Sequence, residues 1–576
     1  MNTLNSLPDR GAGLKNETSI ELRNALHKWI FIPLFMGSVI GVVEAAFITF
    51  YDLIWRSISP YLRFPFIFVV LPLGFLLSYL IMRFVGNSLP GSSTHVVLRR
   101  FHFEDGAGDA KESLASPISS AITMGFGGSA GLEGPSLSIG GSIAYRLSRL
   151  LGVKGNEMRV LFLAGAGAAL GAVLKAPLTG ILFAIEVPYT QDIEHNVFLP
   201  AIPMGVVAYG VYVAIVGQTP IFAQIQGITF PSPFEMGFSV LEGLFLGGIA
   251  LAFIYVYKYM ERINVSGKKW DYVAVVIGGL TLAAIGCVMP LSLGIGYGVI
   301  SASLLSGGLW NYGAAFILML VLAKIITTSV TLNEGGSGGL FIPSIFIGAV
   351  ASVGLLKVLG LPFSPILVAA GAAAMVAATN KTLLAAVAFV AETMSPYAII
   401  PALLAGATAY LLTSNKGLYE NQLQFSPART HVALMRISNK AKLETEATLS
   451  EIMRPTRFRL SPDDDLSHAI SLFSLSGDTA LPVVDPTGKY VGRVELETLL
   501  ASKVTNVTEL IIRDRPLFED ETAGVAVNRI LSSGKGIVFV VDRDRKLKGV
   551  IRTADLIKHY SKALYAMGEE HGSYPI

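Results

Sequence analysis

The sequence predicts an all-α polytopic membrane protein built from two related halves, followed by a soluble α/β tail. Three observations predict this class: a deficit of charge, long apolar runs broken by glycine and proline, and an internal duplication. Hydrophobic residues make up 52% of the 576 residues and charged residues 15%, well below the roughly 25% of soluble domains. Residues 431–576 hold nearly half of the charged residues in a quarter of the chain. An apolar unit therefore precedes a tail of ordinary soluble composition.

Composition also excludes several classes of function. The net charge of +3 lacks the basic excess that a nucleic-acid groove needs, so no nucleic-acid partner is expected. Cys287 is the single cysteine, which rules out a disulfide framework and a cysteine-based zinc site. Residues 1–28 are polar and lack the order of a cleaved signal peptide. We expect the first apolar run, which begins at Trp29, to remain as a membrane span.

The apolar runs predict many membrane helices of unequal length. A helix needs about 20 mostly apolar residues to cross a bilayer. The runs that reach this length are 29–55, 64–84, 197–217, 236–257, 272–292 and 311–333. Shorter runs rich in glycine and proline are 115–125, 136–150, 158–174, 176–188, 341–358, 364–379, 382–394 and 397–413. Lipid tolerates interrupted helices only where protein or water covers their free backbone groups. This pattern favours a transporter or channel over a simple anchor.

Two collinear matches predict that the membrane unit is a duplication. Residues 127–141 (GGSAGLEGPSLSIGG) and 335–349 (GGSGGLFIPSIFIGA) are identical at nine of 15 positions. Residues 165–186 and 371–392 are identical at eight of 22 positions. The second match includes two charged pairs: Lys175 with Lys381, and Glu186 with Glu392. Because transporters often place a midplane site between two such halves, we expect the functional site at their interface.

The tail predicts two copies of a small α/β module. Strand–turn–strand patterns cover 483–492 and 538–551, and each follows a helix-like stretch. The predicted boundaries are a polar segment 1–28, a membrane unit 29–426 with halves of about 29–217 and 236–426, a linker 427–445, a module pair 446–565 and an end segment 566–576.

The glycine-rich repeats have the form of helix starts that bind anions. Residues 131–135 (GLEGP) and 339–343 (GLFIP) place glycine and proline where backbone N–H groups are unpaired. A helix N-terminus offers about half a positive charge. This suits conduction because a full cation would hold an anion too tightly. Pro90–Ser93 (PGSS) has the same form more weakly. The alternative is that these glycines only let helices pack closely.

Glu133 distinguishes the two copies, because the matching position in the second copy is Phe341. A carboxylate within the membrane costs about 2.5–3.5 kcal/mol, which suggests a function. At an anion-binding helix start it can occupy the site itself and leave when protonated, which would link protons to anions. The alternative is an acidic residue that merely stabilises the N-terminus of its helix.

The ordered set of these motifs resembles the CLC family of chloride channels and transporters. The set consists of GSSTH at 91–95, GLEGP at 131–135, GGLFIP at 338–343, Gly417-Leu418-Tyr419 and the paired tail modules. The resemblance covers residues 30–565. It implies two inverted repeats, a homodimer with one anion pathway per subunit, and a tail that resembles a tandem cystathionine-β-synthase (CBS) pair. It also implies a multi-pass location in the cell membrane with the tail in the cytoplasm.

The resemblance implies specific site residues. Ser92 resembles the serine of the central anion site, and Tyr419 resembles the tyrosine that faces it. The amides of Leu340 and Phe341 resemble the backbone donors of that site. Glu133 resembles the gating glutamate, with which a proton would be exchanged.

Several positions depart from the family pattern. The usual GSGIP is here Gly91-Ser92-Ser93-Thr94-His95, so Ser93, Thr94 and His95 are candidates for tuning the filter. His95 also suits a purely structural role at a loop–helix junction. Leu132 replaces the arginine of GREGP. Val187 stands where many proton-coupled members carry an internal glutamate. This weakens the case for tight coupling unless a water path or the preceding Glu186 serves as the inner proton path.

The tail offers one candidate ligand site. Residues 549–555 (GVIRTAD) partly match the CBS nucleotide pattern, in which a final aspartate binds ribose. Asp555 is therefore a possible adenine-nucleotide contact, although Arg552 replaces the usual threonine. The first module has Glu495 and Thr498 at the corresponding positions and is degenerate. A tail that only dimerises is the alternative. No other cofactor and no metal are expected.

We expect transport of chloride or a similar monovalent anion rather than an enzymatic activity. Glutamate-gated exchange for protons and a passive voltage- or pH-gated chloride channel both remain open. A remote alternative is an intramembrane serine hydrolase, because 127–131 (GGSAG) and 335–339 (GGSGG) fit G-x-S-x-G. A serine nucleophile needs a nearby base, and no histidine lies inside a long apolar run. The expected partners are therefore chloride, protons, the lipid bilayer and a second copy of the chain.

Overall fold

The computed structural model describes residues 27–559 except for 154, 223–229, 264–270, 425–446, 457, 477, 502–505, 534–535 and 557. The chain divides into two units, Met1–Ser426 and Pro427–Ile576, and each unit is described by itself. The predicted segment 1–28 lies almost wholly outside the described residues, and the linker 427–445 and end segment 566–576 lie wholly outside them.

The first unit is helical because backbone groups in lipid must be paired within each segment. The helices of its first half are α2 (Ile32–Ile58), α3 (Ile67–Leu80), α4 (Ser93–Phe103), α5 (Ala110–Gly125), α6 (Glu133–Leu150), α7 (Asn156–Val173), α8 (Pro177–Glu186) and α9 (Phe198–Val216). Those of its second half are α10 (Pro233–Ile263), α11 (Asp271–Val288), α12 (Tyr297–Ser303), α13 (Ala314–Asn333), α14 (Phe341–Val358), α15 (Pro365–Asn380), α16 (Leu383–Thr393) and α17 (Ile399–Thr413). Short π or 3₁₀ segments are His27–Phe31, Ser59–Tyr61, Ile81–Val85, His195–Val197, Pro290–Ser292, Leu309–Asn311 and Pro396–Ala398.

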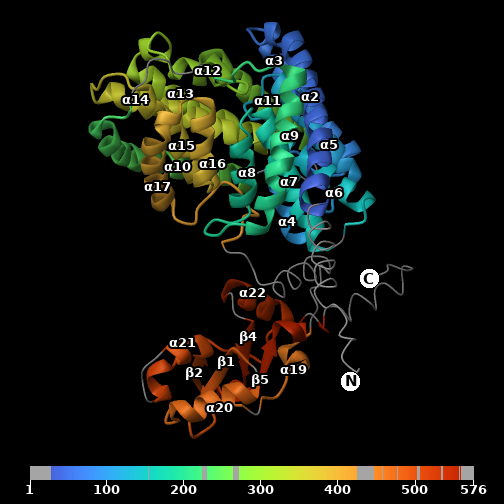
Figure 1. Cartoon of the computed structure of the whole chain (residues 1–576), viewed down its shortest axis with the longest axis vertical. Coiled ribbons are helices and arrows are strands. Elements are labelled where there is room, and N and C mark those ends of the chain that lie inside the picture. The colour runs from blue at the N-terminus through green and yellow to red at the C-terminus, as the bar shows by residue number, and fades with distance from the viewer. Residues whose placement is uncertain are drawn as a thin grey trace, which may run out of the picture. The chain divides into compact units, whose positions relative to one another are not determined.

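The packing of the helices repeats between the halves, which supports the duplication. Within the first half α6 packs on α7, α7 on α9, and α2 on α9. Within the second half α14 packs on α15, α15 on α17, and α10 on α17. The halves meet through α3 with α11 and through α8 with α16, and Figure 1 shows the blue-to-teal first half beside the green-to-gold second half. The repeated segments of the sequence are the starts of α6 and α14, and the α7–α8 and α15–α16 pairs.

Eight of the described helices are long and apolar enough to cross a membrane. Six of these correspond to the long runs of the sequence. The other two, Phe341–Val358 and Pro396–Thr413, come from runs that the sequence analysis treats as short. The second of them reaches spanning length because the 3₁₀ turn Pro396–Ala398 continues into α17. The fold class of a polytopic helical membrane unit is confirmed.

The tail folds as two small sheets with flanking helices, as the strand–turn–strand patterns predict. Strand β1 (Ala480–Val484) pairs antiparallel with β2 (Tyr490–Glu495). In the second module β4 (Ile537–Val541) pairs parallel with β3 (Leu517–Phe518) and antiparallel with β5 (Leu547–Arg552). The flanking helices are α19 (Leu449–Ile452), α20 (Leu466–Ser476), α21 (Leu496–Ala501), α22 (Ala523–Ser533) and a 3₁₀ turn, Val507–Leu510.

Candidate functional site: an anion seat between two helix starts

Three loops from distant parts of the sequence meet at the centre of the first unit. Gly131 and Gly339 exchange backbone hydrogen bonds of 3.0 and 2.8 Å. The N–H of Ser93 donates to the carbonyl of Gly338 at 3.1 Å, and the N–H of Gly338 donates to the carbonyl of Gly91 at 3.2 Å. The helices α4, α6 and α14 therefore begin close together, as the repeated glycine-rich segments predict.

The Glu133 carboxylate lies on the N-terminus of α14. Its Oε1 accepts the backbone N–H of Phe341 at 2.5 Å and that of Ile342 at 3.2 Å. The side chain is fully buried, and its Oε2 has no hydrogen-bond partner. Free N–H groups at a helix start together with the helix dipole favour a negative charge. The carboxylate thus occupies a place that suits a small anion.

Two backbone N–H groups of α14 hold the Glu133 carboxylate. They belong to Phe341, which is also one of the two donors predicted for the central anion site, and to Ile342, which the sequence analysis did not single out. Leu340 is the N-cap residue, and its carbonyl accepts the N–H of Ser344 at 3.2 Å. The unpaired N–H groups that face outward belong to the first helical turn, which starts one residue later. A role for the Leu340 amide remains a prediction.

Glycine is required beside this carboxylate. A Cβ atom added to Gly131 would lie 1.9 Å from Oε2 of Glu133, and one added to Gly339 would lie 2.4 Å from its Cδ. A Cβ atom and the carboxylate cannot occupy the same space, so any larger residue would displace the carboxylate. We call the place in front of the N–H groups of Phe341 and Ile342 the anion seat. These two glycines leave the space that the anion seat needs, rather than only letting helices pack.

The predicted hydroxyl pair is buried and has no hydrogen-bond partner. Ser92 is 5% exposed and Tyr419 is 3% exposed, and neither hydroxyl forms a hydrogen bond within the described residues. The Thr94 hydroxyl lies next to the Tyr419 hydroxyl, and it too has no hydrogen-bond partner among the described residues. Buried hydroxyls are normally hydrogen-bonded, so these orphaned groups indicate a place for a ligand or water.

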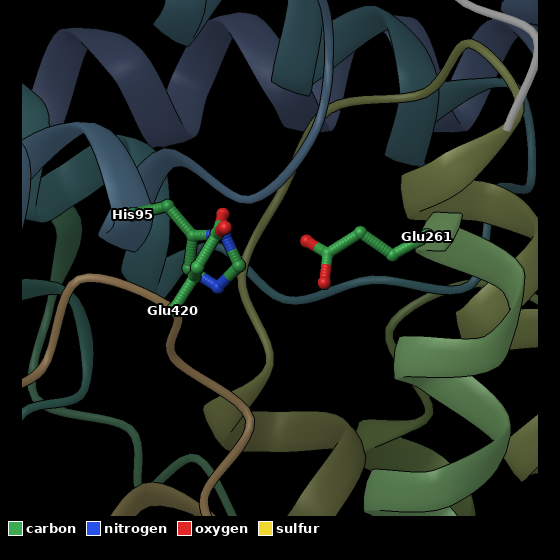
Figure 2. A group of neighbouring side chains, drawn as sticks. All are labelled: His95, Glu261 and Glu420. Atoms are coloured by element: carbon green, nitrogen blue, oxygen red, sulfur yellow. The ribbon is translucent and has the colours of Figure 1, made fainter.

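The other candidate filter residues have different surroundings. Ser93 uses its Oγ to bond Ser116 Oγ at 3.0 Å, which indicates a packing role. The His95 ring stands at about a right angle to the rings of Tyr257 and Tyr419, with centroids 6.3 and 5.8 Å away. Figure 2 shows His95 beside Glu420.

A cavity of 350 Å³ opens in front of Ser92. We name it the Ser92 pocket; its polar lining residues include Ser88, Ser92, Ser93, His95, Arg99, Tyr257, Glu261, Asn333 and Ser337. Arg99 is the one arginine or lysine of this lining. Because the lining includes Ser92, the pocket leads to the orphaned hydroxyl of that residue.

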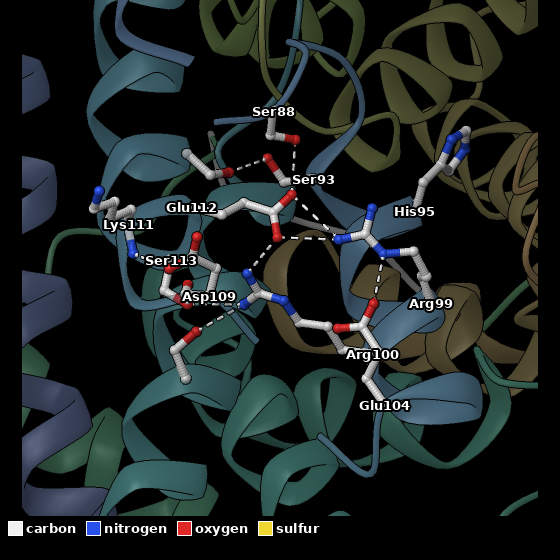
Figure 3. Close-up of polar contacts among 12 residues, drawn as sticks. Ser88, Ser93, His95, Arg99, Arg100, Glu104, Asp109, Lys111, Glu112 and Ser113 are labelled. Carbon is white, nitrogen blue, oxygen red and sulfur yellow. Dashed lines mark hydrogen bonds and ion pairs between the residues drawn. The ribbon is translucent and has the colours of Figure 1, made fainter. Parts of the chain in front are cut away.

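An ion-pair cluster fixes α4 against α5, and the sequence analysis did not find it. Glu112 accepts from Arg99 at 3.0 Å and from Arg100 at 2.7 Å, as the dashed lines of Figure 3 show. Ser88 donates to the same carboxylate at 2.8 Å, and Arg99 also pairs with Glu104 at 3.0 Å. Since α4 begins directly after Ser92, this cluster positions the serine.

Lys324 is a second residue that the sequence analysis did not find. It is fully buried, and its Nζ donates to the carbonyls of Gly294 at 2.8 Å and Ser292 at 3.3 Å. The ammonium lies 4.8 Å from the centroid of the Phe346 ring and attracts the Glu133 carboxylate. A lone lysine inside the apolar run 311–333 is a signal that would have indicated a functional place.

Two more acidic residues are fully buried in the membrane unit, so Glu133 is not alone. Glu44 accepts from Ser136 at 3.0 Å, and Glu242 accepts from Ser352 at 2.5 Å. In each half an acid on the first long helix thus meets a serine on the helix that carries the anion-binding start. Neither acid belongs to the repeated glycine-rich segments 127–141 and 335–349, so the duplication does not point to them.

Glu186 and Glu392, which the duplication matches, each cap the N-terminus of a helix in the other half. Glu186 ends α8, and its two oxygens accept the N–H groups of Leu384 at 2.9 Å and Ala385 at 2.8 Å, at the start of α16. Glu392 near the end of α16 accepts the N–H groups of Leu178 at 2.9 Å and Thr179 at 2.8 Å, at the start of α8. This reciprocal exchange explains both acids by helix capping.

The matched lysines close the ends of two other helices. Lys175 donates to the carbonyl of Gly217 at 2.8 Å, just after α9, and Lys381 donates to the Thr413 hydroxyl at 2.6 Å, at the end of α17. Cations stabilise helix C-termini. The four charged residues of the second sequence match are therefore paired with helix ends in both halves.

A model of the family described as voltage gated chloride channel matches residues 73–414, which is more than half of the chain. The chain belongs to this family. Models of the CBS domain match residues 449–504 and 507–562, so the CLC unit is followed by two CBS domains. Both parts of the resemblance seen in the sequence are confirmed.

The CLC chain is similar to one curated protein in sequence and to several solved structures in fold. An uncharacterized protein of Methanocaldococcus jannaschii is 25% identical over 393 residues, covering 68% of this chain and 95% of the relative. The crystal structure of a CLC-type fluoride/proton antiporter superposes with a TM-score of 0.62 at 21% identity, over 70% of this chain and 98% of that one. The crystal structure of a slow cyanobacterial Cl⁻/H⁺ antiporter superposes with a TM-score of 0.60 at 19% identity, over 68% of this chain and 96% of that one. The crystal structure of a eukaryotic CLC transporter superposes with a TM-score of 0.57 at 18% identity, over 91% of this chain and 98% of that one.

The two G-x-S-x-G serines of this CLC chain have architectural contacts. Ser129 Oγ lies 3.0 Å from Thr328 Oγ1 and accepts from Thr327 at 3.1 Å. Ser337 Oγ accepts from Ser119 at 2.9 Å. These partners are hydroxyl groups, which are too weakly basic to activate a nucleophile. CLC proteins are transporters and channels, and these contacts do not support the serine hydrolase alternative.

In the second CBS domain the Asp555 carboxylate is already engaged. Its Oδ1 lies 2.6 Å from Nε of Arg454, and its Oδ2 accepts the N–H of Arg552 at 3.1 Å. Arg552 itself forms two hydrogen bonds with Asp478, at 2.7 and 2.8 Å. A ribose would therefore have to compete with Arg454 for this carboxylate. Adenine-nucleotide binding at Asp555 remains a prediction.

Proposed function

We propose that this CLC protein transports chloride or a similar monovalent anion across a membrane, through a pathway in each chain that the Glu133 side chain closes. One observation supports the proposal above all: a buried carboxylate sits on the N–H groups of Phe341 and Ile342, where it mimics an anion. In this state the seat is filled by the protein's own charge, and an anion must displace it.

The other groups along the proposed pathway are suited to moderate rather than tight binding of an anion. Beyond Glu133, the orphaned hydroxyls of Ser92 and Tyr419 provide a second, neutral place for the anion, and the Ser92 pocket provides access to it. Neutral donors and helix starts bind small anions with moderate strength, as conduction through several sites requires. Lys324 adds one distant positive charge that attracts either the carboxylate or the anion that replaces it.

Glu133 links protons to anions in this proposal. The charged carboxylate and an anion compete for the same N–H donors, and both cannot occupy them because like charges repel. Protonation removes the charge of the carboxylate and most of its attraction to the helix start. A proton on Glu133 and an anion in the seat therefore favour each other.

Two candidate functions follow, and a specific observation supports each. Exchange of anions for protons is supported by the fold shared with solved proton-coupled antiporters. A passive, proton-gated channel is supported by the position where many proton-coupled members carry an internal glutamate. Val187 is buried there, and both oxygens of the neighbouring Glu186 accept N–H groups at a helix start, so neither residue offers a free proton acceptor. We place exchange first, because a water path can carry a proton between the inner side and Glu133.

The experiment is anion flux from liposomes that contain the purified protein, with simultaneous recording of chloride and pH. Exchange predicts that an outward chloride gradient drives protons inward against a proton gradient. A passive channel predicts chloride flux that depends on pH without driving any proton movement. Absence of anion flux from well-folded protein at every pH would contradict the proposed function itself.

The reciprocal caps offer a matched test of the inner proton path. Glu186→Gln and Glu392→Gln each weaken one cap and are expected to cost about 1.5–3 kcal/mol of stability, measured as similar falls in melting temperature. If Glu186 serves only as a cap, both variants keep the wild-type ratio of protons to chloride. Loss of proton movement in the Glu186 variant alone would instead establish it as the inner proton residue.

We also propose that the protein is a homodimer with its CBS tail in the cytoplasm, as the family resemblance implies. Large apolar side chains are exposed on the helices that surround the reciprocal caps; they include Leu178 on α8, Leu199 on α9, Leu384 on α16 and Leu403 on α17. These side chains must face lipid or a second copy. Mass measurement of the detergent-solubilised protein distinguishes the monomer from the dimer.

A further inference from the structure

Three metal-ligating side chains meet beside the anion pathway. His95 on α4, Glu261 near the end of α10 and Glu420 directly after Tyr419 offer ligand atoms that all lie within 4.8 Å of one another. Figure 2 shows the Glu261 carboxylate pointing toward the His95 ring and the Glu420 carboxylate. His95 and Glu261 also line the Ser92 pocket.

The His95 ring has a buried nitrogen without a hydrogen-bond partner. The ring forms a hydrogen bond with the backbone of Leu418, and its Nε2 is the buried nitrogen with no hydrogen-bond partner among the described residues. A ring that donates one N–H to a carbonyl keeps the lone pair of its other nitrogen free for a ligand. This orphaned buried nitrogen is independent of the two acids and points to a bound group.

The two carboxylates lack a matching charge. Glu261 and Glu420 repel each other, and neither forms a salt bridge within the described residues. The nearby cations are Lys258, which attracts Glu261, and Arg99, which already pairs with Glu104 and Glu112. An acidic pair at the access route of an anion is unfavourable until a cation neutralises it.

We propose that His95, Glu261 and Glu420 form an inhibitory site for a divalent transition metal of the zinc class. One imidazole and two carboxylates with a water molecule complete a four-coordinate zinc shell. Ligand atoms of such a shell lie about 3.5 Å apart, so an inward movement of about 1 Å by the exposed Glu420 side chain closes it. The acids then meet a charge of +2.

The position of the ligands gives the site its effect on transport. His95 lies three residues after Ser92, and Glu420 is bonded to Tyr419 in sequence. A metal that joins these ligands ties the two sides of the orphaned hydroxyl pair to each other and to α10. Bound metal therefore holds the passage between Ser92 and Tyr419 in one arrangement and slows the anion.

Cobalt(II) binding tests the site without any transport measurement. Co²⁺ added to tag-free, metal-stripped protein is expected to give a visible d–d absorption band with one metal per chain, displaced by Zn²⁺. His95→Ala and Glu420→Gln are each expected to weaken Co²⁺ binding at least tenfold. His195→Ala, at an exposed histidine outside the cluster, serves as the matched control and keeps the band. Equal binding in all four proteins, or none in the wild type, would overturn the proposal.

Flux measurements test the inhibitory effect, which rests on the proposed anion transport. Zn²⁺ on the side of the Ser92 pocket is expected to slow chloride flux at least tenfold in the wild type and less than twofold in Glu261→Gln. Undiminished flux in zinc-saturated protein overturns the inhibition. If Zn²⁺ does not bind and Glu261→Gln instead shifts the pH dependence of flux, the acids share a proton and the metal site is refuted. If the band is present but no anion flux exists in any protein, the metal site stands and the proposed function fails.

Discussion

Replacing Glu133 with glutamine is expected to make anion flux nearly independent of pH. The wild-type flux should rise about tenfold or more as the pH falls from about 7 to 4, because protonation removes the charge that holds the carboxylate on α14. Glutamine is neutral at every pH, so the anion competes with an uncharged side chain. The variant should show the high flux at all pH values and no coupled proton movement, measured in liposomes with chloride and pH electrodes.

Two controls separate gating from damage to the fold. Glu133→Ala removes the side chain and should behave like the glutamine variant, since both leave the N–H groups of Phe341 and Ile342 free for an anion. Glu242→Gln changes an equally buried acid that meets Ser352 rather than a helix start, and it should keep the wild-type pH dependence. If Glu133→Gln retains the wild-type pH dependence and proton movement, Glu133 is not the gate.

The second large effect is expected from Gly339→Ala. The added methyl group would lie 2.4 Å from the Cδ and Oε1 atoms of Glu133, far inside van der Waals contact. It therefore occupies the place of the carboxylate and of the anion that replaces it. Chloride flux should fall about tenfold or more at every pH. The overpacking should lower the free energy of unfolding by about 1–3 kcal/mol, which is observed as a lower melting temperature.

A surface glycine and a double variant make this result specific. Gly248→Ala adds a methyl group in α10 where nothing lies within 4 Å, and it should leave flux unchanged. The double variant Glu133→Ala/Gly339→Ala should stay slow, since the methyl group still fills the seat. Recovery of fast flux in the double variant would show that the methyl group disturbs only the carboxylate, and that the anion binds elsewhere.

The sequence was most informative where the chemistry is local. The GLEGP and GLFIP segments predicted two helix starts, and Glu133 and Phe341 are joined by a hydrogen bond. The same local reasoning missed Ile342, because a motif does not show which N–H groups of the first turn face the ligand. Lys324 and Glu242 were missed since each is a single charged residue in an apolar run without a motif.

Long-range pairing was beyond the sequence for a physical reason. The duplication matched Glu186 with Glu392, but only the packing of α8 on α16 shows that each acid caps the helix of the other half. The His95 cluster is harder still, because its members come from α4, α10 and the segment after α17. Burial and orphaned polar atoms, which depend on all neighbours at once, reveal such sites, whereas residue spacing does not.

The most direct test of the account is the structure of Glu133→Gln in bromide, with the anomalous signal used to locate the ion. The account predicts a bromide peak within hydrogen-bond reach of the N–H groups of Phe341 and Ile342, with the glutamine side chain moved away. The wild type at neutral pH should show no bromide there. A glutamine that keeps the carboxylate's position, with no anomalous peak at the start of α14, would contradict the central claim that Glu133 occupies an anion seat.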